Sequence, residues 1–274
     1  MIKNVLIIFF ITFVAGKAIA QHVISGKVTD LKGNPLPYVN IGIIGGKTGT
    51  VSNREGVYTL TFPDEFLKDS ITFSCIGFQE KAYIGSDLSG KKNMKIMLTE
   101  KVALLKEVTI SNAKRKTRKL GITGRTPMIS IPTSSLTSTD IFEQARLIHL
   151  SSPAKILNAN IFLISDDARE VTIRVNFYGF KNGQPTGRLI EKNIIKQKVI
   201  KKGWLTIDLS DQDIYIDNDF VVSFEYLPNS TTDNKRIVFG AKLGASDSWL
   251  RSNSLGVWRK NELGGATMYV TAEM

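Results

Sequence analysis

The segment EVTIRVNFY, Glu170 to Tyr178, shows the alternation that decides the fold class of this chain. Apolar side chains occupy every second position, and polar side chains occupy most positions between them. Successive side chains of a β-strand point to opposite faces of a sheet, so this pattern predicts a strand with one buried face and one solvated face. Thr172, Arg174, Asn176 and Tyr178 are expected to face water.

Segments of similar character flank this strand throughout the second half of the chain. The expected strands are residues 141–149, 156–164, 189–199, 204–209, 220–226, 236–241 and 266–272. Together with the first segment they predict a jelly-roll-like β-sandwich over residues 131–274. The sequence KNGQP at 181–185 is interpreted as a hairpin tip or an exposed connection.

The first half of the chain also consists of short apolar segments separated by turn residues. The expected strands are residues 23–29, 38–44, 57–62, 70–76, 93–98 and 105–110. Their spacing predicts a small β-sandwich over residues 21–111. The periodicity then stops near the basic run KRKTRK at 114–119, so residues 112–130 are predicted to form a basic linker.

Three segments of the first half carry a family resemblance: GKVTD at 26–30, GNPLPYVNI at 33–41 and TGTVSNREGVY at 48–58. In order and spacing they resemble the carboxypeptidase regulatory-like domain, and ITFSCIGF at 71–78 and LKEV at 105–108 are similar to its next strand and its exit. The resemblance implies a small transthyretin/Ig-like β-sandwich, so the chain is predicted to be all-β. It also implies a non-catalytic accessory module of the kind found in envelope proteins of Bacteroidetes-type bacteria.

The first twenty residues have the pattern of a secretory signal peptide. Lys3 precedes an apolar run over residues 5–15, and the small residues at 18–20 predict cleavage after Ala20. The run is shorter than the ~20 residues of a membrane-spanning helix, and no transmembrane segment is expected in the mature chain. The protein is therefore predicted to be exported, to the periplasm or to the extracellular or cell-surface space.

The charge of the chain suggests the kind of partner it meets. The formal net charge is +11, and removal of Lys3 and Lys17 with the signal peptide lowers it by two. A basic surface favours anionic envelope components, although a dispersed solubilising charge is the more ordinary interpretation. Export argues against nucleic acid, so the expected partner is an envelope protein or a polysaccharide.

Few residues offer chemistry that would make this chain an enzyme. A single cysteine, Cys75, excludes an internal disulfide, and it also excludes the usual structural zinc sites, which need at least two cysteines. Neither His22 nor His149 accompanies a Gly-x-Ser-x-Gly motif, so no catalytic residue, metal or cofactor is predicted. The aspartates between Asp211 and Asp219 leave a calcium site open, but local turn hydrogen bonds are the more ordinary explanation of turn aspartates.

Two tryptophans and an arginine near the end of the chain are the candidate ligand-binding residues. Trp249, Arg251 and Trp258 lie close together in sequence and suggest stacking against a sugar, although large rings more often fill a core. We therefore predict a non-catalytic extracytoplasmic binding or adaptor protein of the bacterial cell envelope. The alternative is a carbohydrate-binding accessory protein, which would be distinguished by exposed, coplanar rings on the second sandwich.

Overall fold

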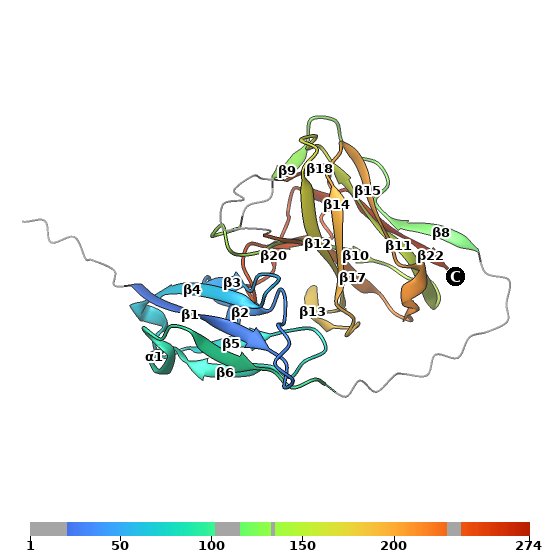
Figure 1. Cartoon of the computed structure of the whole chain (residues 1–274). Coiled ribbons are helices and arrows are strands. Elements are labelled where there is room, and N and C mark those ends of the chain that lie inside the picture. Colours follow the sequence, from blue (N-terminus) through green and yellow to red (C-terminus); the bar gives the residue numbers. More distant parts are fainter. Residues whose placement is uncertain (1–20, 102–115, 133–134, 229–236) are drawn as a thin grey trace, which may run out of the picture.

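The computed structural model describes residues 21–101, 116–132, 135–228 and 237–274. The signal peptide, the strand expected at 105–110 and the start of the expected linker lie outside these residues. The described chain is all-β and forms two sandwiches, as predicted (Figure 1). We call residues 21–101 the first module and residues 116–274 the larger sandwich.

The first module is built from two small sheets. Its elements are β1 (Gln21–Thr29), β2 (Asn40–Ile43), β3 (Gly49–Val51), β4 (Val57–Pro63), η1 (Asp64–Phe66), β5 (Ser70–Ser74), β6 (Lys81–Ile84), α1 (Gly85–Leu88) and β7 (Met94–Met97). One sheet has the order β4-β1-β7 and the other β3-β2-β5-β6. Ile24, Phe62 and Phe73 are fully buried in the core of the module.

The larger sandwich contains most of the strands. They are β8 (Thr117–Gly121), β9 (Ser130–Pro132), β10 (Phe142–Ile148), β11 (Ala154–Leu163), β12 (Glu170–Lys181), β13 (Gln184–Arg188), β14 (Ile194–Val199), β15 (Gly203–Asp208), β16 (Ile214–Ile216), β17 (Phe220–Leu227), β18 (Val238–Leu243), β19 (Ser248–Arg251), β20 (Arg259–Lys260), β21 (Gly264–Ala266) and β22 (Met268–Glu273). A short 3-10 helix, η2 (Ser210–Gln212), precedes β16.

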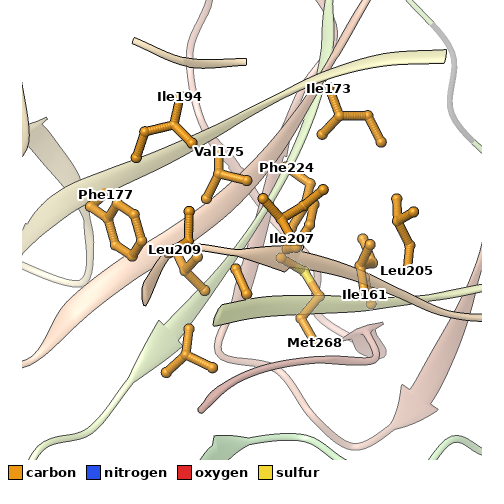
Figure 2. Close-up of a cluster of buried hydrophobic side chains, with 14 of the residues drawn as sticks. Ile161, Ile173, Val175, Phe177, Ile194, Leu205, Ile207, Leu209, Phe224 and Met268 are labelled. Carbon is orange, nitrogen blue, oxygen red and sulfur yellow. The ribbon is translucent and has the colours of Figure 1, made fainter. Parts of the chain in front are cut away.

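Two sheets of the larger sandwich enclose its core. One has the order β13-β12-β17-β10-β19-β20 with β14 paired to β12, and we call it the docking sheet. The other has the order β21-β18-β11-β22-β8, with β15, β16 and β9 attached. Figure 2 shows the apolar side chains between them, including Val175 and Phe177 of β12, Ile161 of β11 and Ile207 of β15.

The alternation of residues 170–178 correctly predicts the burial of the apolar side chains, but it does not correctly predict the exposure of the polar ones. Val175 and Phe177 are buried in the core, as predicted. The opposite face was expected to be solvated, yet Thr172, Arg174, Asn176 and Tyr178 are buried as well. The prediction of a wet face is wrong because other parts of the chain, among them the first module, pack against this side of the docking sheet.

The predicted linker also contains regular structure. β8 pairs antiparallel with β22 from Tyr269–Gly121 to Glu273–Thr117, so part of the basic segment is an edge strand of the larger sandwich. Lysine and arginine on an exposed edge strand discourage pairing with another chain, which explains how a basic run is accommodated there. Within the described residues, no helix is long and apolar enough to cross a membrane.

Candidate functional site

Four charged residues form a row across the outer face of the docking sheet. The strand registers place Arg174 of β12 opposite Glu225 of β17, Glu225 opposite Glu143 of β10, and Glu143 opposite Arg251 of β19. We call these four residues the charged row. Each is less than a tenth exposed, and Arg174, Glu143 and Glu225 are fully buried. Buried charges are costly unless they are paired and hydrogen-bonded, so this row needs an explanation.

An ion pair at each end neutralises the row, and a hydrogen-bonding amide bridges its middle. Arg251 Nε lies 2.5 Å from Glu143 Oε2, and Arg174 Nε lies 3.3 Å from Glu225 Oε2. The two glutamates are neighbours, and Asn176 Nδ2 donates to both of them, at 2.9 Å to Glu143 and 2.8 Å to Glu225. The amide thereby bridges two like charges that would otherwise repel one another.

The surrounding hydroxyl groups complete the network around Glu143. Tyr178 donates its hydroxyl to Glu143 Oε1 at 2.9 Å, Ser223 donates to the same oxygen, and Arg251 Nη2 donates to the Tyr178 oxygen at 2.9 Å. Burial alone would raise the pKa of Glu143, but Arg251 and the Ser223 hydroxyl together hold that pKa below its usual value. Glu143 is therefore a buried carboxylate that stays ionised.

The ligand-binding residues predicted from sequence lie beside this network. Arg251 belongs to the charged row, and its guanidinium lies 4.7 Å from the centre of the Trp258 ring. Trp258 is half-buried and packs edge-on against Tyr178, with ring centres 5.5 Å apart. Trp249 is only 2% exposed and packs against Phe180. The structure brings the three predicted residues to one region, where they support the charged row.

Aromatic side chains also gather on the other sheet, around Trp204 of β15. Trp204 is 38% exposed, and its ring meets Phe162 at 87° and Tyr269 at 77°. Lys119 lies over the Tyr269 ring, and Arg125 lies over the Phe162 ring. The rings meet edge to face, whereas stacking along a saccharide chain calls for exposed rings in a common plane.

The first module docks through backbone groups near the charged row. Arg174 Nη2 donates to the carbonyl oxygen of Tyr38 at 2.8 Å, and Asn253 Nδ2 donates to that of Gly46 at 3.1 Å. Backbone amides of the module donate in the other direction, from Val51 to the Thr139 carbonyl at 3.1 Å and from Gly45 to the Leu255 carbonyl at 2.8 Å. These bonds fix the module against the larger sandwich at several separate points.

Asp140 of the larger sandwich lies at its junction with the first module, beside Gly49. Its Oδ1 accepts hydrogen bonds from the backbone amides of Ile141 at 2.8 Å and Ser254 at 2.9 Å. Its Oδ2 is buried and has no hydrogen-bond partner in the described part of the chain. Burial raises the pKa of Asp140 to about 7, the Ser254 and Ile141 bonds oppose this rise, and the Glu225 charge adds to it.

Glycine is required where the β2–β3 hairpin meets this carboxylate. A Cβ atom on Gly49 would lie 2.8 Å from Asp140 Oδ2 and 2.9 Å from the Ser254 carbonyl oxygen. Gly42, which is opposite Gly49 in the hairpin, would place its own Cβ 3.1 Å from the same carbonyl. The two glycines let the hairpin backbone approach the larger sandwich directly.

Replacing Gly49 by alanine is expected to loosen the docked arrangement by about 1 to 3 kcal/mol, the usual cost of forcing a methyl group into packed surroundings. Hydrogen exchange at the Val51 and Gly45 amides, which bond across the junction, would measure the loosening directly. The matched control is Gly124→Ala, because a Cβ at Gly124 meets nothing within 4 Å. Equal exchange rates in both variants would show that the hairpin contact does not hold the module.

A pocket of about 220 Å³ opens at the same junction. The first module supplies one wall and the segment around β13 the other, and the lining residues are Ser74, Cys75, Ile76, Glu80, Lys101, Tyr178, Thr186, Gly187, Arg188 and Glu191. Glu191 spans the junction, because it accepts a hydrogen bond from the Gly77 amide at 3.2 Å and another from Lys101 at 3.3 Å.

Arg188 is the residue in this pocket that sequence reasoning missed. It is opposite Tyr178 in the β12–β13 pairing, and its guanidinium lies 5.6 Å from the centre of the Tyr178 ring. Its Nε and Nη2 atoms are buried and have no hydrogen-bond partner within the described residues. Nothing in the sequence marks Arg188, because arginine is common in turns and on strand ends.

Among the other candidate residues, His149 and Asp213 lie away from this junction. His149 is exposed and pairs with Asp219 at 2.6 Å, while Asp213 pairs with Lys155 at 2.8 Å. No group of three potential metal-binding His, Cys, Asp or Glu side chains comes together in the described ranges. Cys75, by contrast, lines the junction pocket from the first module; it is buried, and burial raises the pKa of its thiol.

His22 has a structural setting that the sequence did not suggest. Its Nδ1 lies 2.6 Å from the Ser89 hydroxyl and its Nε2 lies 2.5 Å from Asp64 Oδ1. These are the residue types of a hydrolase triad, but the Asp64 side chain is 58% exposed, so water competes for the bond between His22 and Asp64. The observed effect is to hold the start of β1 against η1 and the end of α1.

Comparison with known proteins supports the identity of the first module. Residues 24–110 match the family model of the CarboxypepD_reg-like domain, which confirms the resemblance seen in the sequence. No curated protein matches the chain.

Solved structures resemble the chain only remotely. The cysteine protease and lectin-like domains of Cwp84, a surface layer associated protein of Clostridium difficile, share 9% identity with a TM-score of 0.38, over 93% of this chain and 59% of that one. A second structure of the clostridial cysteine protease Cwp84, after propeptide cleavage, shares 8% identity with a TM-score of 0.41, over 93% and 71%. Infectious bursal disease virus, Gx strain, shares 7% identity with a TM-score of 0.30, over 92% and 63%. The chain thus spans less than two thirds of the first of these proteins.

Proposed function

We propose that this chain, whose first module is a CarboxypepD_reg-like domain, is a non-catalytic binding or adaptor protein of the bacterial cell envelope, and that it binds at the junction of its two sandwiches. The observation that supports this proposal is the docking sheet. Its outer face carries a buried charged row, and part of that face is covered by the first module instead of by water.

A fixed junction between the two sandwiches can hold a binding pocket in shape, whereas a flexible linker between them cannot. Hydrogen bonds at several points hold the module, and the pocket draws its walls from both parts of the chain. A pocket built in this way keeps its shape only while the module is docked. Partner binding and module docking are therefore coupled in our proposal, and a ligand that bridges both walls stabilises the junction.

Site-directed photo-crosslinking of the exported protein in native envelopes tests this proposal. A photoreactive amino acid at Thr186, an exposed residue on the pocket wall, is expected to capture one discrete adduct. The matched control position is Lys202, also exposed, whose backbone amide bonds to Asp166 near the start of β12, at the end of that strand opposite to β13.

The test compares adduct formation from position 186 with adduct formation from position 202. An adduct formed from Thr186 and absent from Lys202 supports binding at the junction, and Gly49→Ala should reduce its yield if docking shapes the pocket. Equal labelling from both positions, or none from Thr186, would contradict a binding site there. Identification of the adduct as protein or polysaccharide would also separate an adaptor from a carbohydrate-binding accessory protein.

A further inference from the structure

We propose that the junction pocket binds a carboxylate, and that Arg188 receives it with the side of its guanidinium group that carries Nε and Nη2. This inference deepens the proposed function, on which it rests, by naming the chemistry of the ligand. It starts from an imbalance of buried charge at the junction. The charged row contains two arginines and two glutamates, so it is balanced without Arg188.

The unpartnered atoms of Arg188 have a definite geometry. Nε and Nη2 lie on the same edge of the planar guanidinium and donate in parallel directions. This edge matches the two oxygens of a carboxylate, which form two parallel hydrogen bonds with it. Both atoms are shielded from solvent, and no protein acceptor lies within hydrogen-bond distance of them in the described structure.

Neighbouring residues hold the guanidinium without neutralising it. The Tyr178 ring lies beside Arg188, and the Tyr178 hydroxyl is already occupied by Glu143 and Arg251. Burial would lower the pKa of Arg188, but Tyr178 and Glu225 raise it further than burial lowers it. The arginine therefore stays charged, and a buried charge without a hydrogen-bonded partner favours an anionic ligand.

The pocket rim limits which anions fit. Glu80 and Glu191 both lie on the lining, and Lys101 is already paired with Glu191. Two acidic groups at the rim disfavour a polyanion such as a polyphosphate or a nucleic acid. They favour a single carboxylate followed by hydrogen-bond donors, and the carboxyl terminus of a peptide has this arrangement. The pocket of about 220 Å³ has room for a small terminal residue.

The wall that carries Arg188 has the features of an adjustable element. The β12–β13 pairing shifts register between Tyr178 and Phe180, and such irregularities commonly re-aim a side chain next to a binding site. Gly187 immediately precedes the arginine, and a Cβ there would meet nothing within 4 Å. Because solvent does not reach Nε or Nη2, we expect the carboxylate to enter with a local movement of β13.

Nuclear magnetic resonance of the arginine side chains tests the proposal with small probes. The Nε–H signal of Arg188, assigned by its loss in Arg188→Lys, is followed while N-acetylglycine is added to the protein. A saturable shift is expected with N-acetylglycine, and none is expected with N-acetylglycinamide, which lacks only the charge. Because Arg188→Lys lacks this signal, calorimetric titration with N-acetylglycine measures its binding, which should be at least tenfold weaker than that of the wild type. Arg259→Gln, at an exposed arginine, should bind as the wild type does.

The remaining outcomes separate this inference from the proposed function. Equal shifts with the amide, or with sodium sulfate, would overturn a carboxylate site. A response to glucuronate and not to N-acetylglycine would overturn the peptide terminus in favour of an acidic sugar. If no probe shifts the Arg188 signal while the photoreactive residue at position 186 still captures its adduct, the proposal of a carboxylate ligand is wrong and the proposal of binding at the junction stands.

Discussion

Replacing Arg251 by methionine is expected to lower the free energy of unfolding by about 3 to 5 kcal/mol, because it leaves the buried Glu143 carboxylate without its ion-pair partner. The same change removes a donor to Tyr178 and the cation that lies over Trp258. Denaturant unfolding followed by tryptophan fluorescence measures the loss, since Trp258 reports on this region.

Two further variants separate the charge from the packing of Arg251. Arg259→Met, at an exposed arginine nearby in sequence, should change stability little. The double variant Arg251→Met with Glu143→Gln should recover much of the loss, because the charged row then holds only the paired Arg174 and Glu225. A double variant as unstable as Arg251→Met alone would show that the aliphatic and ring contacts of Arg251 matter more than its charge.

Asparagine at position 140 is expected to make the protein more stable than the wild type near pH 7, with the difference disappearing near pH 4. The folded state keeps the proton on Asp140 up to about pH 7, whereas the unfolded chain releases it near the ordinary aspartate value of 3.8. Raising the pH across this window therefore favours unfolding of the wild type. The shift corresponds to at most about 4 kcal/mol, and asparagine does not ionise.

Urea unfolding of both proteins at several pH values from 4 to 7 measures this effect. The expected result is a wild-type stability that falls relative to Asp140→Asn as the pH rises. Asp87→Asn, at an exposed aspartate, is the control for a general loss of negative charge. Parallel pH profiles for the wild type and Asp140→Asn would mean that this carboxyl does not keep its proton at the junction.

Local pattern was enough to predict the all-β class and most strands. The alternation around Val175 and Phe177 depends only on the two-residue repeat of a strand, and the structure places both side chains in the core. The Asn182-Gly183 pair likewise marks the β12–β13 turn, where both residues have positive φ. Short strands such as β3, β16 and β19 were missed, because three or four residues carry too little pattern.

The candidate site could not be predicted from local sequence pattern, because its residues come together only through the register of paired strands. Arg174, Glu225 and Glu143 are far apart in sequence and meet only when β12, β17 and β10 align. A polar residue on the outer face of a strand looks the same in sequence whether water or another module covers it. For the same reason, the sequence placed Trp249 and Trp258 near a site without showing that one ring is buried and the other supports Arg251.

The first module contributes mainly backbone groups to the junction: the carbonyl oxygens of Tyr38 and Gly46 and the amides of Val51, Gly45 and Gly77. Every residue carries the carbonyl oxygen, and every residue other than proline carries the amide N–H, so mutation of a side chain does not remove these groups. The angle between the two sandwiches depends instead on backbone conformation: Gly45 and Gly77, at φ of 71° and 82°, adopt conformations that side chains rarely tolerate, so these positions admit few other residues. A second constraint falls on Gly42 and Gly49, where any added side chain would separate the two backbones.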